Sequence, residues 1–97
     1  MIGSRWTHRS NHETLVWEDL CDVARRLGME VRQESLPDET RLKGGIVRLR
    51  GKLVFFVETR LPQGRKNQLL ADVVKGCAIR DISMPPYLRE LLDPHGS

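Results

Sequence analysis

Apolar residues recur with helical spacing in the first third of the chain. They stand at Val16, Leu20, Val23, Ala24 and Leu27. This spacing places them on one face of a helix. Ser10 stands three residues before Glu13 and forms a capping box, in which each side chain satisfies a free amide at the helix start. Gly28 is typical of a left-handed C-terminal cap. We therefore predict a helix over residues 11–27, preceded by a flexible tail at residues 1–9.

An alternating pattern follows this helix. Apolar and polar side chains alternate over residues 29–36, which predicts a short strand with one polar face. Residues 37–45 are polar and end in glycine, so we expect a loop. Two strand-like runs at residues 46–50 and 53–58 flank Gly51-Lys52, which predicts a tight hairpin of type II′. The second run is apolar on both faces, and we therefore expect it in the centre of the sheet.

The hairpin also predicts which side chains share a face. With that turn, the cross-strand pairs are Leu49 with Val54 and Val47 with Phe56, all on one face. Arg48 and Arg50 then point to the other face. The register matters because a shift by one residue would exchange the two faces.

Two further helices are expected in the second half of the chain. Pro62 is typical of a first helical turn, and Gly76 ends the helical pattern. The predicted buried face of this helix is Leu69, Leu70, Val73 and Val74. Pro85 and Pro86 can only begin a helix, and apolar residues continue that helix as far as Asp93. The order of elements predicts an α+β fold, in which helices pack on one face of a small, three-stranded, largely antiparallel sheet.

Length and composition indicate one ordinary globular domain. The chain has 97 residues, of which 39% are hydrophobic, and this suits a single small core. We assign residues 10–93 to the domain and residues 94–97 to a loose C-terminal end. The longest apolar run, residues 53–57, is too short for a membrane span or a secretory signal. Two cysteines form no disulfide framework. We therefore expect a cytoplasmic protein with free thiols and no membrane partner.

Positive charge is concentrated in one segment. Residues 41–66 contain eight basic residues and one acidic residue, whereas the segments before and after them are net acidic. Such a segment can attract nucleic acid, phosphate or an acidic protein face, although it is also typical of a solvated hairpin. The candidate binding residues are Arg41, Lys43, Arg48, Arg50 and Lys52. Only Phe55 and Phe56 accompany them as aromatic residues, which favours contacts with phosphates over base stacking.

Few residues suit catalysis or metal binding. His8 and His12 are one helical turn apart and could hold a metal with Cys21, but no further ligand pair is nearby. Cys21 and Cys77 stand among apolar residues, which is typical of small buried side chains. A catalytic thiol needs a base and an electropositive neighbourhood, which only folding could supply here. We expect no catalytic residue, no metal and no cofactor.

Several short segments follow the order helix, strand, loop, hairpin, helix. They are Arg26-Leu27-Gly28-Met29-Glu30-Val31, Gly44-Gly45-Ile46-Val47, Lys52-Leu53-Val54-Phe55-Phe56-Val57, Arg60-Leu61-Pro62 and Leu70-Ala71. In this pattern, the stretch from Val16 to Gly76 resembles the start of the ImmA/IrrE-type zinc metallopeptidase domain. The active helix of that family typically reads Leu-Ala-His-Glu-x-x-His. Here Leu70-Ala71 is followed by Asp72, Val73, Val74 and Lys75. The resemblance therefore implies a scaffold without its zinc site, and such a peptidase cannot act without the metal.

These observations predict a small, non-catalytic protein-interaction or adaptor module, with a homodimer as one form that the interaction can take. The candidate interaction helix contains Met84, Tyr87, Leu88 and Leu91. It offers more apolar surface than so small a body is expected to cover, although the same helix could simply close the core. The alternative function is binding of nucleic acid or phosphate through the basic hairpin.

Overall fold

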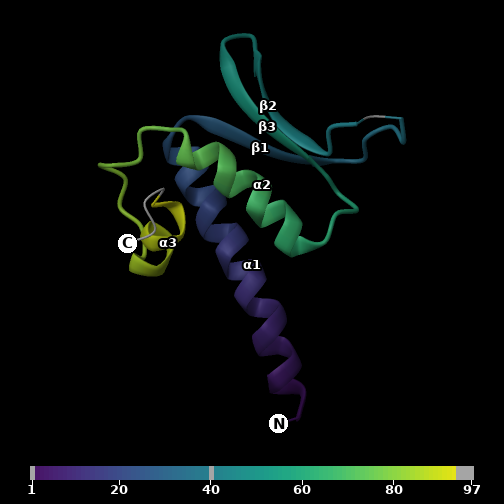
Figure 1. Ribbon diagram of the computed structural model, residues 1–97, viewed down its shortest axis with the longest axis vertical. Coiled ribbons are helices and arrows are strands. Elements are labelled where there is room, and N and C mark those ends of the chain that lie inside the picture. The colour runs from purple at the N-terminus through teal and green to yellow at the C-terminus, as the bar shows by residue number, and fades with distance from the viewer. Residues whose placement is uncertain (1, 40, 94–97) are drawn as a thin grey trace.

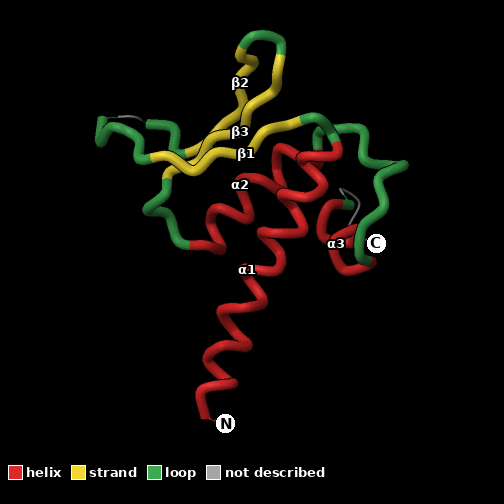
Figure 2. Tube along the Cα trace, turned by 180° about the vertical axis from the view of Figure 1, so that it is seen from behind, coloured by secondary structure: helices red, strands yellow, loops and turns green. Residues whose placement is uncertain are grey.

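The computed structural model describes the backbone of residues 2–39 and 41–93 and the side chains of residues 12–39 and 41–93. Within these ranges the elements are α1 (Ile2–Arg26), β1 (Met29–Glu34), β2 (Gly44–Leu49), β3 (Lys52–Glu58), α2 (Gln63–Lys75) and α3 (Pro86–Leu92). The sheet forms one layer and the helices lie together on one of its faces (Figures 1 and 2). The predicted α+β class and order of elements are confirmed.

Helix α1 begins earlier than predicted. It starts at Ile2 instead of residue 11, so the predicted start of this helix is wrong. Ser10 lies inside the helix and does not begin it. No proline interrupts this segment, and a helix that has formed gains one further hydrogen bond for each added residue without a new nucleation step. The predicted end is confirmed, because Gly28 follows the helix with a φ of +84°.

Some predictions fall outside the described residues. They concern the side chain of His8 and the C-terminal end at residues 94–97.

The predicted apolar stripe of α1 faces the core. Leu20, Val23 and Ala24 are almost fully buried, and Trp17 and Cys21, which lie beside this stripe, are buried as well. The buried face is wider than predicted because α1 contacts β1 and α2 and also α3.

The sheet is mixed, with strand order β1-β3-β2. Strand β3 is central as predicted, and it pairs antiparallel with β2 and parallel with β1. The ladder of β1 ends at Glu34, two residues earlier than predicted. Gly44 and Gly45, predicted in a loop, begin β2. There the Phe56 ring lies beside Gly45, within 3.5 Å of where a Cβ atom would stand.

The predicted hairpin register and turn are wrong. Leu49 pairs with Lys52 instead of Val54, so the turn consists of Arg50 and Gly51. Their φ angles are 51° and 81°, and two positive φ values are typical of a type I′ turn, whose twist matches that of the strands. The register differs from the prediction by two residues, which leaves the faces unchanged.

The two faces of the sheet therefore differ in what covers them. Phe55 and Val57 of β3 are fully buried against the helices, together with Met29 of β1. The opposite face, which no helix covers, carries Val47, Leu49, Val54 and Phe56.

The other two helices begin at the predicted prolines, and the first of them ends at the predicted glycine. Helix α2 begins after Pro62 and ends before Gly76, and Leu70 and Val74 are its fully buried residues. Helix α3 begins at Pro86. Residues 78–82 link the two helices without forming a strand.

Candidate interaction surface

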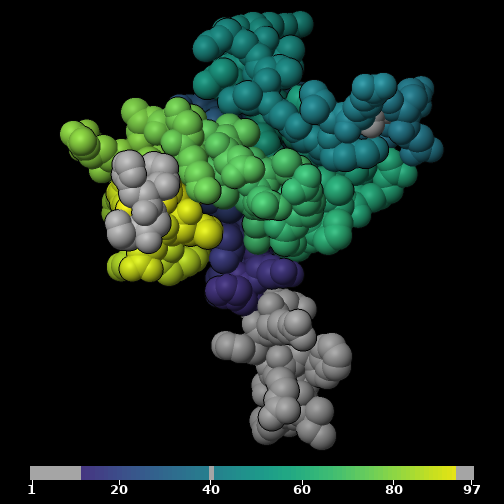
Figure 3. All heavy atoms as spheres, viewed as in Figure 1, coloured from purple at the N-terminus to yellow at the C-terminus, as the bar shows by residue number. Residues whose placement is uncertain are grey.

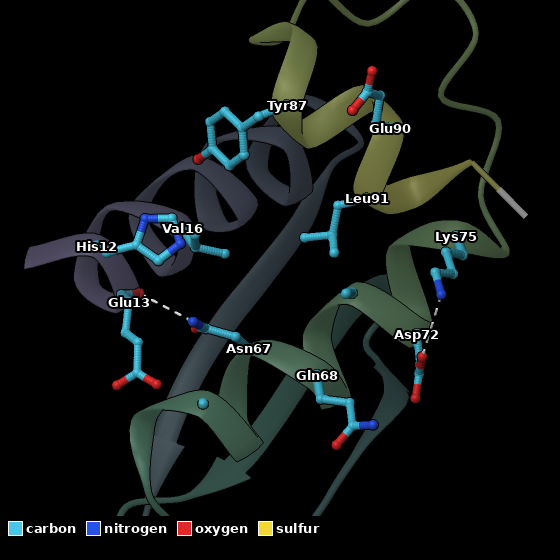
Figure 4. A pocket seen from close by; sticks show the side chains of 12 residues that line it. His12, Glu13, Val16, Asn67, Gln68, Asp72, Lys75, Tyr87, Glu90 and Leu91 are labelled. Carbon is cyan, nitrogen blue, oxygen red and sulfur yellow. Dashed lines mark hydrogen bonds and ion pairs between the residues drawn. The ribbon is translucent and has the colours of Figure 1, made fainter. Parts of the chain in front are cut away.

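A groove of about 780 Å³ opens between α1, α2 and α3 (Figure 4). In the space-filling view α1 is seen through a gap between α2 and α3 (Figure 3). The gap exists because α3 has only seven residues and covers only part of the α1–α2 pair. Val16 and Ala71 are buried beneath this opening, and Leu91 points into it. The floor of the groove is therefore apolar.

The predicted interaction helix has two distinct faces. Leu88 is fully buried. Met84, which was predicted in this helix, precedes α3 and packs against the core, so both residues close the domain. Tyr87 and Leu91 are 40% and 47% exposed, and both line the groove. Residues four apart share a helix face. The structure thus brings Tyr87 and Leu91 together at the surface and separates them from Leu88 and Met84.

Tyr87 connects α3 to α1. Its hydroxyl donates a hydrogen bond to the carboxylate of Asp19. Partial burial, together with this hydrogen bond and the charge of Asp19, raises the pKa of Tyr87 to about 12. The phenol therefore remains a protonated donor at neutral pH, and the contact holds its ring at the wall of the groove.

The rim of the groove is acidic. Glu13, Asp72 and Glu90 are exposed on α1, α2 and α3 respectively. Lys75 Nζ lies 4.0 Å from Asp72 Oδ1 and partly neutralises that carboxylate. The amide Nδ2 of Asn67 donates a hydrogen bond to the Glu13 carbonyl at 3.0 Å, which fixes α2 against α1. An apolar floor with an acidic rim favours a ligand that is apolar in the middle and basic at its edges.

The predicted basic residues do not converge on one face. Arg48 lies on the same face as Phe55, because its cross-strand partner is Leu53, and Lys52 lies on the opposite face. Arg50 stands in the turn. Arg48 Nη1 donates a hydrogen bond to the Gly51 carbonyl at 3.2 Å.

The other two predicted binding residues lie away from the tip of the hairpin. Arg41 and Lys43 precede β2 at its other end. None of the five basic candidates forms an ion pair with a described residue. Their charges are therefore spread along a hairpin that projects beyond the helices (Figure 1).

An ion pair between the buried Glu58 and the exposed side chain of Arg60, at the end of β3, was not predicted. Glu58 is 3% exposed, and its carboxylate accepts hydrogen bonds from the Arg60 guanidinium and from the backbone amides of Arg60 and Leu36. These bonds, those of the Arg60 side chain above all, lower the pKa of Glu58 to about 2. An acidic residue ending an apolar strand, two residues before an arginine, was the signal available in the sequence. The pair holds the loop after β1 and does not line the groove between the helices, so we assign it to the scaffold.

A second buried polar contact joins α2 to β1. Lys66 is 7% exposed, and its Nζ donates a hydrogen bond to Gln33 Oε1 at 2.7 Å. A buried ammonium group needs such a partner, so this residue of the basic segment also stabilises the scaffold.

The two thiols have different surroundings. Burial raises the pKa of the Cys21 thiol to about 11, and because the thiolate is the nucleophile, this environment does not activate it. Cys77 is half-buried, and its Sγ donates a hydrogen bond to the Val73 carbonyl at 3.5 Å. His12 lines the groove in an exposed position. Among the described residues, no group of three His, Cys, Asp or Glu side chains could hold a metal ion.

No protein-family model, curated protein or solved structure matches this chain. The resemblance to the zinc metallopeptidase domain therefore stays a prediction. In the part of the chain that the structure describes, no helix is both long and apolar enough to cross a membrane.

Proposed function

We propose that this protein is a non-catalytic protein-interaction module that binds an amphipathic helix of a partner protein in the groove between α1, α2 and α3. The observation that carries the proposal is an exposed leucine, Leu91, pointing into a groove whose floor is apolar and whose rim is acidic.

The shape of the groove suits a helix. α1 and α2 pack side by side, and α3 covers their junction at one end only (Figure 1). A partner helix in the remaining space would bury Leu91 and the exposed edge of Tyr87. Grooves of this kind bind a helix through apolar side chains that are spaced by three, four and seven residues on one of its faces.

The acidic rim of the groove favours a partner with basic side chains. Glu13 and Glu90 have no ion-pair partner among the described residues, and they stand on α1 and α3, which border the groove. A helix with lysine or arginine on both sides of its apolar stripe would place a positive charge near each carboxylate. Complementary charge of this kind increases the association rate and excludes acidic competitors.

A designed peptide tests this proposal. The probe is a helical peptide of about 14 residues with leucines at i, i+3, i+4 and i+7 and lysines on both flanks, and its binding is measured by isothermal titration calorimetry. We expect weak binding, with a Kd on the order of 100 μM, which further weakens at high salt. The variant Leu91→Glu is expected to reduce the affinity at least tenfold.

The matched control is Leu49→Glu, because Leu49 and Leu91 are both 47% exposed and Leu49 lies on the hairpin. This variant should bind the peptide as the unaltered protein does. A peptide with glutamates in place of the lysines should not bind. The proposal is wrong if the lysine peptide does not bind, or if Leu91→Glu and Leu49→Glu have equal effects.

We further propose a cytoplasmic location. Cys21 and Cys77 are both free thiols, which is typical of reducing compartments. Mass spectrometry of the protein isolated under alkylating conditions should find both cysteines unoxidised.

Nucleic-acid or phosphate binding through the hairpin is the second candidate. It is favoured by the basic side chains, which have no ion-pair partner among the described residues. Phe55 is fully buried and cannot stack on a base, which leaves the half-buried Phe56 as the one aromatic residue of the segment that could, so binding would depend mainly on phosphates. A labelled single-stranded oligonucleotide should then bind at low salt and lose affinity with the double variant Arg48→Ala and Arg50→Ala. Absence of binding at low salt would remove this candidate.

A further inference from the structure

Strand β2 has a free edge whose backbone groups can be assigned from the hairpin register. Leu49 and Lys52 close a two-residue turn, and such a closing pair is hydrogen-bonded, so that every second residue of β2 bonds to β3. The bond from the Glu58 amide to the Lys43 carbonyl, at 2.7 Å, agrees with this alternation. Gly44, Ile46 and Arg48 therefore direct their N–H and C=O groups away from β3.

These outward groups are unused within the described chain. Strand β2 pairs with β3 alone in this sheet, and no described hydrogen bond from a loop or turn reaches the backbone of Gly44, Ile46 or Arg48. An edge of this kind is a template for another strand.

The other edge of the sheet is protected by charge. Along β1, the guanidinium of Arg32 lies 2.6 Å from the Glu30 carboxylate and 3.8 Å from that of Glu34, and charged side chains resist pairing with another strand. On β2, by contrast, Ile46 and Val47 are 41% and 40% exposed. The chemistry of the two edges therefore directs strand pairing to β2.

We propose that two copies of this chain associate through antiparallel pairing of β2 with β2, centred on Ile46, and so form one continuous six-stranded sheet. In this arrangement the two-fold axis is perpendicular to the sheet, so the helices of both copies remain on the same face. The contact is self-complementary and closes at two copies, whereas pairing of β2 with β1 of another copy would leave free edges and continue indefinitely.

Charge sets the centre of the pairing. When the strands pair about Ile46, Arg48 lies opposite Gly44 of the second copy, and the two guanidinium groups stand far apart. Pairing about Arg48 would place these cations directly opposite each other, which destabilises a sheet. On the uncovered face, Val47 then lies opposite Gly45 of the second copy, next to the Phe56 ring that lies beside this glycine.

The contact is small, and this determines the expected affinity. A strand of six residues extends about 20 Å, so the pairing buries less than the ~1,200 Å² of a standard interface. The dimer should therefore be weak and dependent on concentration.

Sedimentation equilibrium of the whole chain between ~5 μM and ~1 mM tests the proposal. We expect the mean mass to rise from that of a monomer toward that of a dimer. In the variant Ile46→Pro the outward N–H is absent, while the hydrogen bonds between β2 and β3 are retained, because proline is tolerated at an edge. This variant should be monomeric at every concentration.

A second variant tests the proposal independently, in case the proline variant does not fold. Ile46→Lys would bring two ammonium groups together at the two-fold axis and should also abolish the dimer, while circular dichroism confirms the fold. The control is Leu91→Lys, at a site that is similarly exposed and distant from the edge, which should dimerise normally. A monomeric wild-type protein at ~1 mM, or a dimer that both Ile46 variants retain, overturns the proposal. Peptide binding in the groove is unaffected by either result, so the two proposals fail independently.

Discussion

The carboxylate of Glu58 accepts hydrogen bonds from Nε and Nη2 of the Arg60 guanidinium at 2.9 Å and 3.0 Å. Arg60 also donates to the Leu36 carbonyl, and the Leu36 amide donates to Glu58. Two residues at the end of the central strand thereby hold the loop that follows β1. This contact gives the domain a specific response to acid.

Stability should fall at acid pH because of Glu58. Its pKa is about 2 in the folded protein and ~4.3 in an unfolded chain. The carboxylate therefore stabilises the fold fully above pH ~4.3, and this contribution is lost as the pH falls toward 2. We expect Glu58→Gln to be less stable than the wild type at pH 7, with a difference that shrinks in acid, as measured by urea denaturation at each pH.

Glu39→Gln is the control for this experiment, because Glu39 is exposed. Its difference from the wild type should remain small at every pH. A difference between Glu58→Gln and the wild type that does not depend on pH would contradict the assigned role.

The two faces of α3 should respond differently to truncation. Leu88 is fully buried and Leu91 is 47% exposed. Leu88→Ala should cost about 2–5 kcal/mol of unfolding free energy, whereas Leu91→Ala should change it by less than about 0.5 kcal/mol. Urea denaturation of the two variants measures both values. Equal losses would contradict the difference in burial between the two faces.

The hairpin turn should be improved by asparagine. Arg50 has a φ of 51°, a left-handed conformation that side chains other than glycine and asparagine adopt at a cost. Arg50→Asn should therefore raise the unfolding free energy by roughly 0.5–1 kcal/mol, and Gly51→Ala should lower it by about 1 kcal/mol. Thermal denaturation checks both signs. The opposite signs would exclude a type I′ turn.

The cysteines should differ in reactivity. Cys21 is 8% exposed and its pKa is raised to about 11, while Cys77 is half-buried near the end of α2. In the native protein, iodoacetamide should label Cys77 well before Cys21, and after unfolding the two rates should converge. Mass spectrometry of timed samples gives both rates. Preferential native labelling of Cys21 would contradict its assigned burial.

Local signals in the sequence predicted most of the helices and strands. Gly28 ends α1 because the left-handed conformation is easiest for glycine, and Pro62 precedes α2 because proline suits a helix start. These effects act over a few residues and need no partner. The buried faces that contain Leu20 in α1 and Leu70 in α2 followed from helical spacing alone.

The candidate site depended on contacts between distant residues. Four-residue spacing places Tyr87 and Leu91 on one helix face, but only the packing of α3 decided that this face lines a groove while Leu88 enters the core. The predicted hairpin between these two segments is confirmed, but its turn was predicted wrongly, because Gly51 fits either a type II′ or a type I′ turn.

The sequence by itself determined where the chain turns helical or extended, which residues are apolar enough to be buried, and where charge accumulates. Tertiary structure alone decided the parallel pairing of β1 with β3, the register that leaves Ile46 on a free edge, and the burial of Glu58 against Arg60. The physical reason is the distance along the chain over which each of these effects acts. Backbone propensity and helical periodicity are properties of neighbouring residues, whereas strand register, groove shape and the desolvation of a charge depend on which distant segments meet in the folded chain.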